Sequence, residues 1–386
     1  SMYVRLFAAP AAFCVLASCG GSPAIDLGGS ELLNEVSLQV VDSVNDAGSA
    51  FSDCRVAFDR FGAPHVAYRY RGLTDTAQMV DALRYGSGGS GEWRVDSVGD
   101  FAVMGPGFDL ALADSKPRIL FAASAPGEGP ALVEAARDNR GNWNQETLAP
   151  DASLIETVRY VGQHTIDEPR AVLPPAFGEL FRDGYIAFND WRFDPVGALE
   201  TSETLVGFDA AMDREGLVYV CAMVSDGATE RLVYAHELEE ESTRWNVREI
   251  RSGSMASACR ISVSDPGTEA IAVLDEGSQG QVLTLLRPDG PSFVETSVFS
   301  LPEFGDFDLA MSRSATASLA WVDSSRSEIS MAFESDGYAE QRVAVTNPNA
   351  SAVLALSPDG TLGFCSERTQ GSVQELVVGL VARSER

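Results

Sequence analysis

Residues 108–111 read Phe108, Asp109, Leu110 and Ala111, and the same phrase returns as FDAA at 208–211 and as FDLA at 307–310. Each copy is followed by a tight turn and a second apolar run, and the order is clearest where the turn at 59–62 precedes the run at 64–68. Alternating β-branched runs bounded by glycine turns predict β-strands. The chain is therefore a repeat of one all-β unit.

The spacing of the units predicts how many there are. Counting back eight residues from each turn places equivalent slots at 54, 108, 208, 259, 307 and 352, with steps of 54, 100, 51, 48 and 45. The step of 100 hides one degenerate unit, which makes seven. Each unit holds four short runs, as many as one propeller blade. In the unit that begins at Phe108 the four runs span 108–114, 117–123, 132–138 and 142–148, and third runs follow in the other units at 79–85, 185–191, 232–238, 282–287, 329–334 and 375–381.

The two ends of the chain complete one another. The last unit stops at Arg386 without a fourth run, whereas an orphan run at 35–44 precedes the first unit, and its sequence VDSV at 41–44 repeats the VDSV at 95–98. We therefore predict an all-β fold, a seven-bladed β-propeller of four-stranded antiparallel blades. The N-terminal strand should complete the last blade and close the ring, which leaves no open sheet edge. Residues 35–386 are expected to form a single monomeric domain.

The N-terminus has the pattern of an export signal. After Ser1, which precedes the natural start Met2, the chain has a basic Arg5, an apolar run at 6–16 and small residues up to Cys19. An apolar run this short does not span a membrane, which takes about 20 residues. The LASC sequence at 16–19 resembles the bacterial lipobox, in which the cysteine is lipidated and becomes the first mature residue. The resemblance implies that 1–18 is a lipoprotein signal peptide, that Cys19 carries the lipid, and that 19–34 is a flexible tether. The domain would then face the periplasm or the cell surface.

Composition excludes several partners. The 386 residues are 45% hydrophobic and 22% charged, which is typical of a globular chain. Lys and Arg total 28 against 56 Asp and Glu, so the net charge of -28 repels nucleic acid and anionic lipid surfaces. The three histidines are too scattered for a metal motif, and no zinc spacing is present. We expect neither a metal nor a cofactor.

Four cysteines remain when Cys14 and Cys19 are set aside, and they use two slots twice. Cys54 and Cys259 lie eight residues before their turns, whereas Cys221 and Cys365 lie five residues after theirs. In a propeller the first strand of one blade faces the second strand of the preceding blade. We therefore predict two disulfides, Cys221 with Cys259 and Cys54 with Cys365, the latter across the ring closure. The alternative is that these are buried free thiols.

Charged residues follow the slot position in nearly every unit, so we expect them to gather at the central channel. The candidate ligand-binding residues there are Arg55, Asp109, Asp209, Arg260 and Asp308, and Val353 takes the same position in the last unit. They could form a polar mouth that binds a cation, a sugar or a basic side chain. The alternative is a belt of ion pairs between blades, such as Asp209 with Arg260.

The third unit departs from the repeat, because 163–184 replaces a clean second strand. Departures from a repeat gather at functional loops, so this unit contributes three more candidate ligand-binding residues. These residues are His164, Asp167 and Glu168. The alternative is that this copy of the repeat has simply decayed.

The turn DNRGNW at 138–143 resembles the Asp-box of sialidase-like propellers. In that family a Ser or Thr lies two residues before the Asp and one residue separates the Asp from the Gly; here Ala136 replaces the hydroxyl and two residues intervene. The resemblance implies the fold, but the arginines and the Tyr and Glu pair of the family's hydrolases have no matching positions. The expected function is non-catalytic binding or scaffolding for a protein or glycan. A sialidase-like glycoside hydrolase is the alternative, and fold alone does not decide between them.

Overall fold

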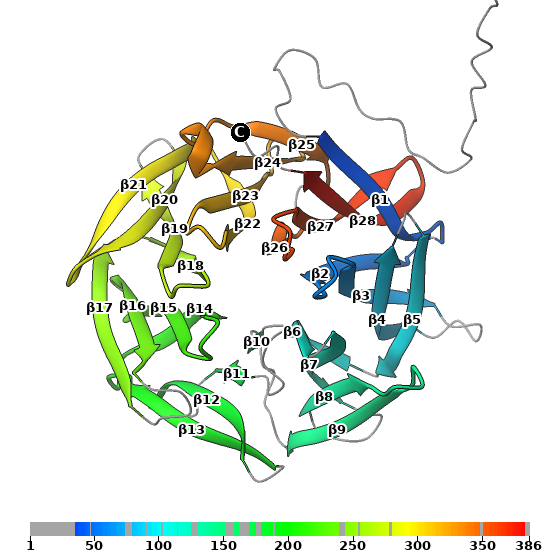
Figure 1. Ribbon diagram of the computed structural model, residues 1–386, viewed down its shortest axis with the longest axis horizontal. Coiled ribbons are helices and arrows are strands. Elements are labelled where there is room, and N and C mark those ends of the chain that lie inside the picture. The colour runs from blue at the N-terminus through cyan, green and yellow to red at the C-terminus, as the bar shows by residue number, and fades with distance from the viewer. Residues whose placement is uncertain are drawn as a thin grey trace, which may run out of the picture.

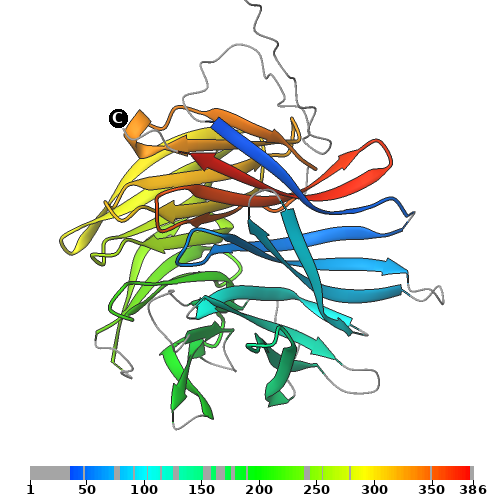
Figure 2. The same cartoon turned by 45° about the vertical axis from the view of Figure 1, so that its right-hand side comes forward.

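A computed structural model has seven β-sheets arranged in a ring. The innermost strands surround the centre of the ring, which we call the channel (Figure 1). It describes residues 35–382 except 47, 74–78, 90–91, 102, 114, 125–129, 151–157, 162–169, 175–178, 188–189, 239–243, 254, 278–279 and 348–349. Every sheet has four antiparallel strands, so the predicted seven-bladed propeller is confirmed. Figure 2 shows the blades stacked side by side around the ring.

In the first six blades the four strands lie in chain order from the channel outward, and in the last blade β26, β27 and β28 are followed outward by β1. The innermost strands are β2 (Ala50–Phe58), β6 (Val103–Ala113), β10 (Arg159–Val161), β14 (Thr204–Met212), β18 (Met255–Val263), β22 (Phe304–Met311) and β26 (Val353–Leu356). The second strands are β3 (Pro64–Leu73), β7 (Lys116–Ser124), β11 (Arg170–Leu173), β15 (Val218–Ser225), β19 (Glu269–Gly277), β23 (Ala317–Asp323) and β27 (Leu362–Gln370).

The outer half of each blade is built in the same way. The third strands are β4 (Met79–Gly89), β8 (Ala131–Arg137), β12 (Glu179–Ala187), β16 (Glu230–Glu237), β20 (Gly280–Asp289), β24 (Glu328–Phe333) and β28 (Val373–Ala382). The outermost strands are β5 (Glu92–Phe101), β9 (Trp143–Pro150), β13 (Asp190–Ala198), β17 (Trp245–Gly253), β21 (Ser292–Leu301), β25 (Gln341–Val345) and β1 (Glu35–Val44). A 3-10 turn, η1 (Glu334–Asp336), follows β24.

The third blade corrects one detail of the sequence analysis. We expected no clean second strand there and a third strand at 185–191, but β11 is a short, fully buried second strand and the third strand, β12, begins at Glu179. The sequence 170–173 is only four residues long, too short to show the period-two alternation that marks a strand.

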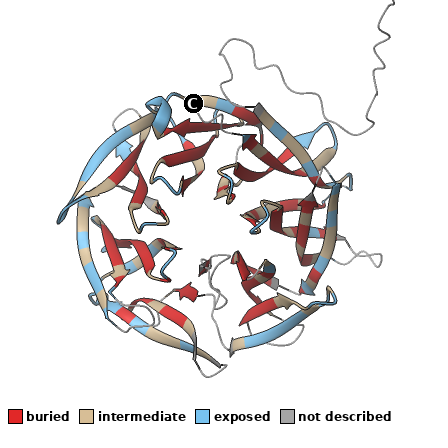
Figure 3. Cartoon of the chain, in the orientation of Figure 1, coloured by how far each residue is buried: buried red, intermediate tan, exposed pale blue. Residues whose placement is uncertain are grey.

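Burial explains why the sequences of the strands differ. Second strands are covered on both faces by neighbouring blades, so β23 is buried along its whole length and reads as a continuous apolar run. Outermost strands face solvent, and β17 is mostly exposed or half-buried (Figure 3). The hydrophobic clusters lie between blades rather than within one, which makes each blade depend on its neighbours.

The turns between first and second strands repeat one hydrogen-bonding device. One Asp59 carboxylate oxygen accepts the N–H groups of Phe61 at 2.9 Å and Ala63 at 2.8 Å, and Gly62 supplies the positive φ of 81°. Asp213 accepts the equivalent pair in the fourth blade. A short polar side chain followed three residues later by glycine therefore marks the turn between the first and second strands of a blade.

The ring closes where the two ends of the chain meet. Strand β1 pairs with β28 from Glu35 opposite Ala382 to Val44 opposite Gln374, as predicted. Asp42 of β1 also forms a 2.7 Å ion pair with Arg84 of the first blade. The closing strand thus joins both neighbours.

One of the two predicted disulfides is confirmed. Cys54 of β2 and Cys365 of β27 are bonded, with a sequence separation of 311 residues. Cys221 of β15 and Cys259 of β18 lie within hydrogen-bonding reach of each other across the equivalent junction, and burial raises the pKa of Cys221. They are nevertheless free thiols, so the prediction of a disulfide there is wrong.

The bulge before the innermost cysteine differs between the two junctions. In β2 it inserts one residue between Ser52 and Cys54, whereas the irregularity in β18 runs from Met255 to Cys259. A disulfide requires Cβ atoms about 3.5–4.5 Å apart in a particular orientation, which an equivalent slot does not guarantee.

Candidate functional site: a charged ring in the channel

The charged residues expected at the channel do come together. Arg55, Asp109, Asp209, Arg260 and Asp308 lie on the innermost strands of five blades, each one residue beyond its slot. Their side chains are between 10% and 20% exposed, so they line the channel without standing free in solvent.

Arg159, at the start of β10, is a sixth member of this ring that we did not predict. Its signal was available, because Arg159 lies midway in the step of 100 residues between Asp109 and Asp209. With Arg159 included, the first six blades alternate between arginine and aspartate around the channel.

Every aspartate of this ring forms an ion pair with the arginine of the preceding blade. Arg55 Nε lies 3.6 Å from Asp109 Oδ1, and Arg260 Nε lies 3.8 Å from Asp308 Oδ1. Asp209 is hydrogen-bonded to the guanidinium of Arg159. The charge of Asp209 also attracts Arg260, as predicted, but the ion pairs of Arg260 within 4 Å are with Asp306 and Asp308 of the sixth blade.

The second oxygen of each aspartate reaches the blade that follows. Asp109 Oδ2 accepts the N–H of Tyr160 at 2.9 Å, Asp209 Oδ2 that of Ile261 at 2.9 Å, and Asp308 Oδ2 that of Leu354 at 2.7 Å. Each carboxylate thus bridges three consecutive blades. Charge-assisted bonds of this kind are stronger than neutral ones.

Seven positions cannot alternate in charge, since seven is odd. A charge at the seventh position would have a like-charged neighbour on one side, either Arg55 or Asp308. Val353 occupies that position, and it contributes no charge while Leu354 still donates its backbone N–H to Asp308.

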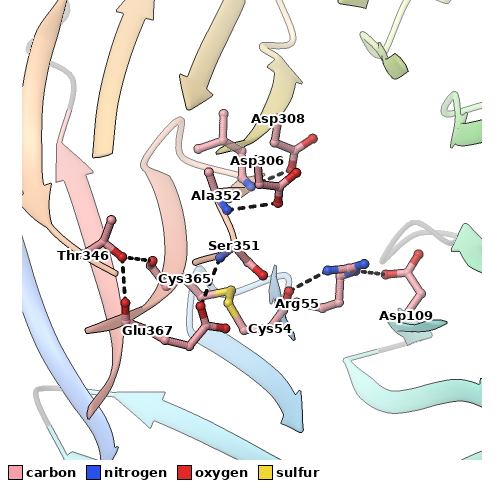
Figure 4. The surroundings of a disulfide bond; sticks show 12 residues. Cys54, Arg55, Asp109, Asp306, Asp308, Thr346, Ser351, Ala352, Cys365 and Glu367 are labelled. Carbon is pink, nitrogen blue, oxygen red and sulfur yellow. Dashed lines mark hydrogen bonds and ion pairs between the residues drawn. A yellow bond between two sulfur atoms is a disulfide. The ribbon is translucent and has the colours of Figure 1, made fainter. Parts of the chain in front are cut away.

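The sixth blade supplies an additional acid. Asp306 Oδ1 lies 2.8 Å from Arg260 Nη2, and its other oxygen accepts the N–H of Ala352 at 3.1 Å. Arg260 therefore has two carboxylate partners. Arg55 pairs with Asp109 (Figure 4).

Burial shifts the ionisation of the ring. Burial raises the pKa of Asp308 to about 7, against the attraction of Arg260 and with added repulsion from Asp209. Burial also raises the pKa of Asp109, which Arg159 and Arg55 partly offset. The pKa of Arg55 is lowered by burial and by Arg159. For Arg159, burial lowers the pKa, but Asp209 and Asp109 outweigh it and raise the value.

Two sets of predicted residues are not tested. His164, Asp167 and Glu168 lie outside the residues that the structure describes, and so does Cys19. Across the described ranges, no group of three His, Cys, Asp or Glu side chains is arranged to hold a metal ion. In the same part of the chain no helix has the length and apolarity needed to cross a bilayer.

Comparison with known proteins shows the fold. No protein-family model matches the sequence, and no curated protein sequence matches it either. Among solved structures, the polysaccharide lyase Uly1 matches with a TM-score of 0.54 and 10% identity over 83% of this chain and 88% of that one. The β-propeller domain of the Trilobed protease from Pyrococcus furiosus matches with a TM-score of 0.53 and 9% identity over 86% and 95%.

A protein of unknown function from Dyadobacter fermentans also matches, with a TM-score of 0.51 and 10% identity over 89% of this chain and 98% of that one. Identities this low carry no activity from one protein to another. The β-propeller is shown, and the resemblance to sialidase-like repeats stays a prediction.

Proposed function

We propose that this chain is an exported, lipid-anchored propeller that binds a protein or a glycan without transforming it. The observation that carries the proposal is the bonding of the channel ring. The three aspartates each bind an arginine of one neighbouring blade and a backbone N–H of the other. The ring therefore holds the blades in place and gives the ligand-binding faces a rigid frame.

The competing function is hydrolysis of a glycoside. Such chemistry uses two carboxyl groups placed about 5–10 Å apart, one to protonate the leaving oxygen and one to attack or to activate water. Asp109, Asp209 and Asp308 are instead engaged in bonds that a reacting carboxyl group would have to give up. This favours binding over catalysis.

The proposal is tested with the full chain in detergent, which is applied to a glycan array and used in a cross-linking pull-down. Glycans are included because Uly1, which shares the fold, is a polysaccharide lyase. We expect saturable binding of one class of ligand and no turnover of that ligand or of fluorogenic glycosides. Release of a sugar product, at a rate reduced by Asp209→Asn, would overturn the proposal.

The anchor is tested separately. Cells expressing the chain are labelled with a radioactive fatty acid, and the protein is then fractionated. We expect label on the wild-type protein and none on Cys19→Ser, which should leave the membrane fraction. Equal labelling of both proteins would contradict lipidation at Cys19.

A further inference from the structure

The two faces of the ring differ in the turns they carry. The chain starts every innermost strand from the same face, which we call the start face; it carries the connections between blades and the turns between second and third strands. The opposite end face carries the turns between first and second strands and between third and fourth strands. This follows from the antiparallel order of the strands in each sheet.

The start face carries exposed acids without counterions. In the described part of the chain none of them has an ion-pair partner. They lie on connections and turns of several blades and are Asp46, Asp100, Glu200, Asp226, Glu276 and Glu303. The exposed arginines of the same turns, Arg71 and Arg326, are bound to Asp81 and Asp323.

The end face is mixed in charge. Its described turns expose acids such as Glu215, Asp289 and Asp336. They also expose cations, among them Lys116, Arg140, Arg214 and Arg313. The acidic character of the start face is therefore a property of that face and not only of the net charge of -28.

Three further acids, one of them buried, lie where the innermost strands of two blades begin on the start face, and we call this group the mouth. Asp53 and Asp306 lie near the start of β2 and β22, and Glu367 lies near the end of β27, which reaches the same face. Glu367 is 5% exposed; one carboxylate oxygen accepts the N–H of Ser351 at 3.0 Å, and Oε1 has no hydrogen-bond partner. Figure 4 shows its carboxylate beside Ser351 and the disulfide.

The environment of Glu367 disfavours its charge. Burial raises the pKa to about 7, and the negative charges of Asp53 and Asp306 add to the rise despite the bond from Ser351. A buried polar atom without a partner is costly and calls for an explanation. A cation brought to the mouth would relieve both the missing contact and the mutual repulsion of the acids.

We propose that the start face docks a lysine- or arginine-rich protein segment, with one cationic side chain entering the mouth beside Asp53, Asp306 and Glu367. This rests on the proposed binding function and names its partner. The acids are spread over connections around the ring, so a small ion would reach few of them, whereas an extended segment advances about 3.3 Å per residue and can reach several. Charge complementarity of this kind gives specificity and a salt-dependent association rate.

The probe is a fluorescent deca-lysine peptide, titrated with the full chain in detergent and followed by anisotropy. Two triple variants each change the net charge from -28 by 3, to -25, on opposite faces. The start-face variant is Asp100→Asn/Glu200→Gln/Glu303→Gln, and the end-face control is Glu215→Gln/Asp289→Asn/Asp336→Asn. We expect the start-face variant to weaken binding about tenfold or more and the control less than twofold.

The mouth is tested with Glu367→Gln, which keeps the shape of the side chain. We expect weaker deca-lysine binding with a folded protein, since a neutral amide removes the charge and not the bond to Ser351. In the wild type at pH 7, binding should release protons, measured calorimetrically in buffers of different ionisation enthalpy, and the variant should release fewer.

Three outcomes would overturn the inference: no binding of deca-lysine, equal weakening by both triple variants, or unchanged proton release in Glu367→Gln. If the array or pull-down still yields a ligand in that case, the proposed binding function stands and only the cationic partner fails. If they yield no ligand and glycosides are turned over, the proposed function itself fails.

Discussion

Asp209→Asn is the most direct test of the charged ring. The substitution keeps an oxygen that can accept the N–H of Ile261, but it replaces the carboxylate that binds Arg159 by a neutral amide. Arg159 then retains only the attraction of Asp109 on its other side. The guanidinium of Arg159, which is 11% exposed, then has one neighbouring carboxylate instead of two to balance its charge.

The magnitude follows from the geometry. At an effective dielectric of about 20, charges about 4 Å apart attract by about 4 kcal/mol. Removing one partner of a buried pair costs about 3–5 kcal/mol. Because Asp109 still faces Arg159 and the backbone bond survives, we expect a loss of about 2–4 kcal/mol. With an unfolding entropy of about 2 cal/mol/K per residue, this lowers the Tm of a domain of this size by about 3–6 °C.

Asp308→Asn provides a control within the same ring. Arg260 keeps the 2.8 Å contact with Asp306, and its distance to Asp308 is the longer 3.8 Å. The carboxyl group, with a pKa raised to about 7, already carries its proton in part at neutral pH. A carboxyl whose folded pKa is raised costs stability as pH rises, so we expect Asp308→Asn to be neutral or stabilising at pH 7, with an effect that shrinks as the pH falls toward 5.

The assay is thermal unfolding followed by circular dichroism at pH 7 and pH 5, at one scan rate because large disulfide-bonded proteins often unfold irreversibly. Binding of the ligand found by the array is measured on the same samples. A Tm of Asp209→Asn within about 1 °C of the wild type, or a larger loss for Asp308→Asn, would refute the structural role of the ring. Lost binding at an unchanged Tm would show that the ring is a ligand site instead.

Three further predictions follow from the closure and the channel. Cys54→Ala should destabilise the protein by about 2–5 kcal/mol in non-reducing unfolding experiments, because the bond closes a loop of 311 residues, and its stability should no longer depend on reductant. Cys221→Ala keeps the bond and should lose stability on reduction as the wild type does; an equal response of the two variants to reductant would contradict the single disulfide. Val353→Arg should lower the Tm, since the new cation would adjoin Arg55, and an unchanged Tm would show that charge parity does not matter. Glu367→Gln should raise stability at pH 8 by up to about 3 kcal/mol and have little effect at pH 5, because a carboxyl whose folded pKa is raised from 4.5 to about 7 costs stability as pH rises through that range; a pH-independent difference would refute the shift.

The repeat made most of the fold predictable. The slots counted seven units, the orphan run at 35–44 gave β1 with its observed bounds, and the slot equivalence of Cys54 and Cys365 gave the closing disulfide. These succeeded because a repeated unit fixes where each residue lies along its strand and which blade it faces. Arg159 was missed because its blade has a three-residue innermost strand, which hides the pattern.

The sequence therefore predicted which residues the strands place at the channel and at the blade junctions. These are five of the six charged residues, the neutral Val353 and the cysteines. Which groups then bond was decided only in three dimensions. Asp209 bonds Arg159 directly and attracts Arg260 only from a longer distance, and Cys221 lies unbonded beside Cys259. Both outcomes depend on the relative placement of neighbouring blades and on local bulges. A one-dimensional period specifies position along a strand and carries no information on the distance and direction between side chains of different blades.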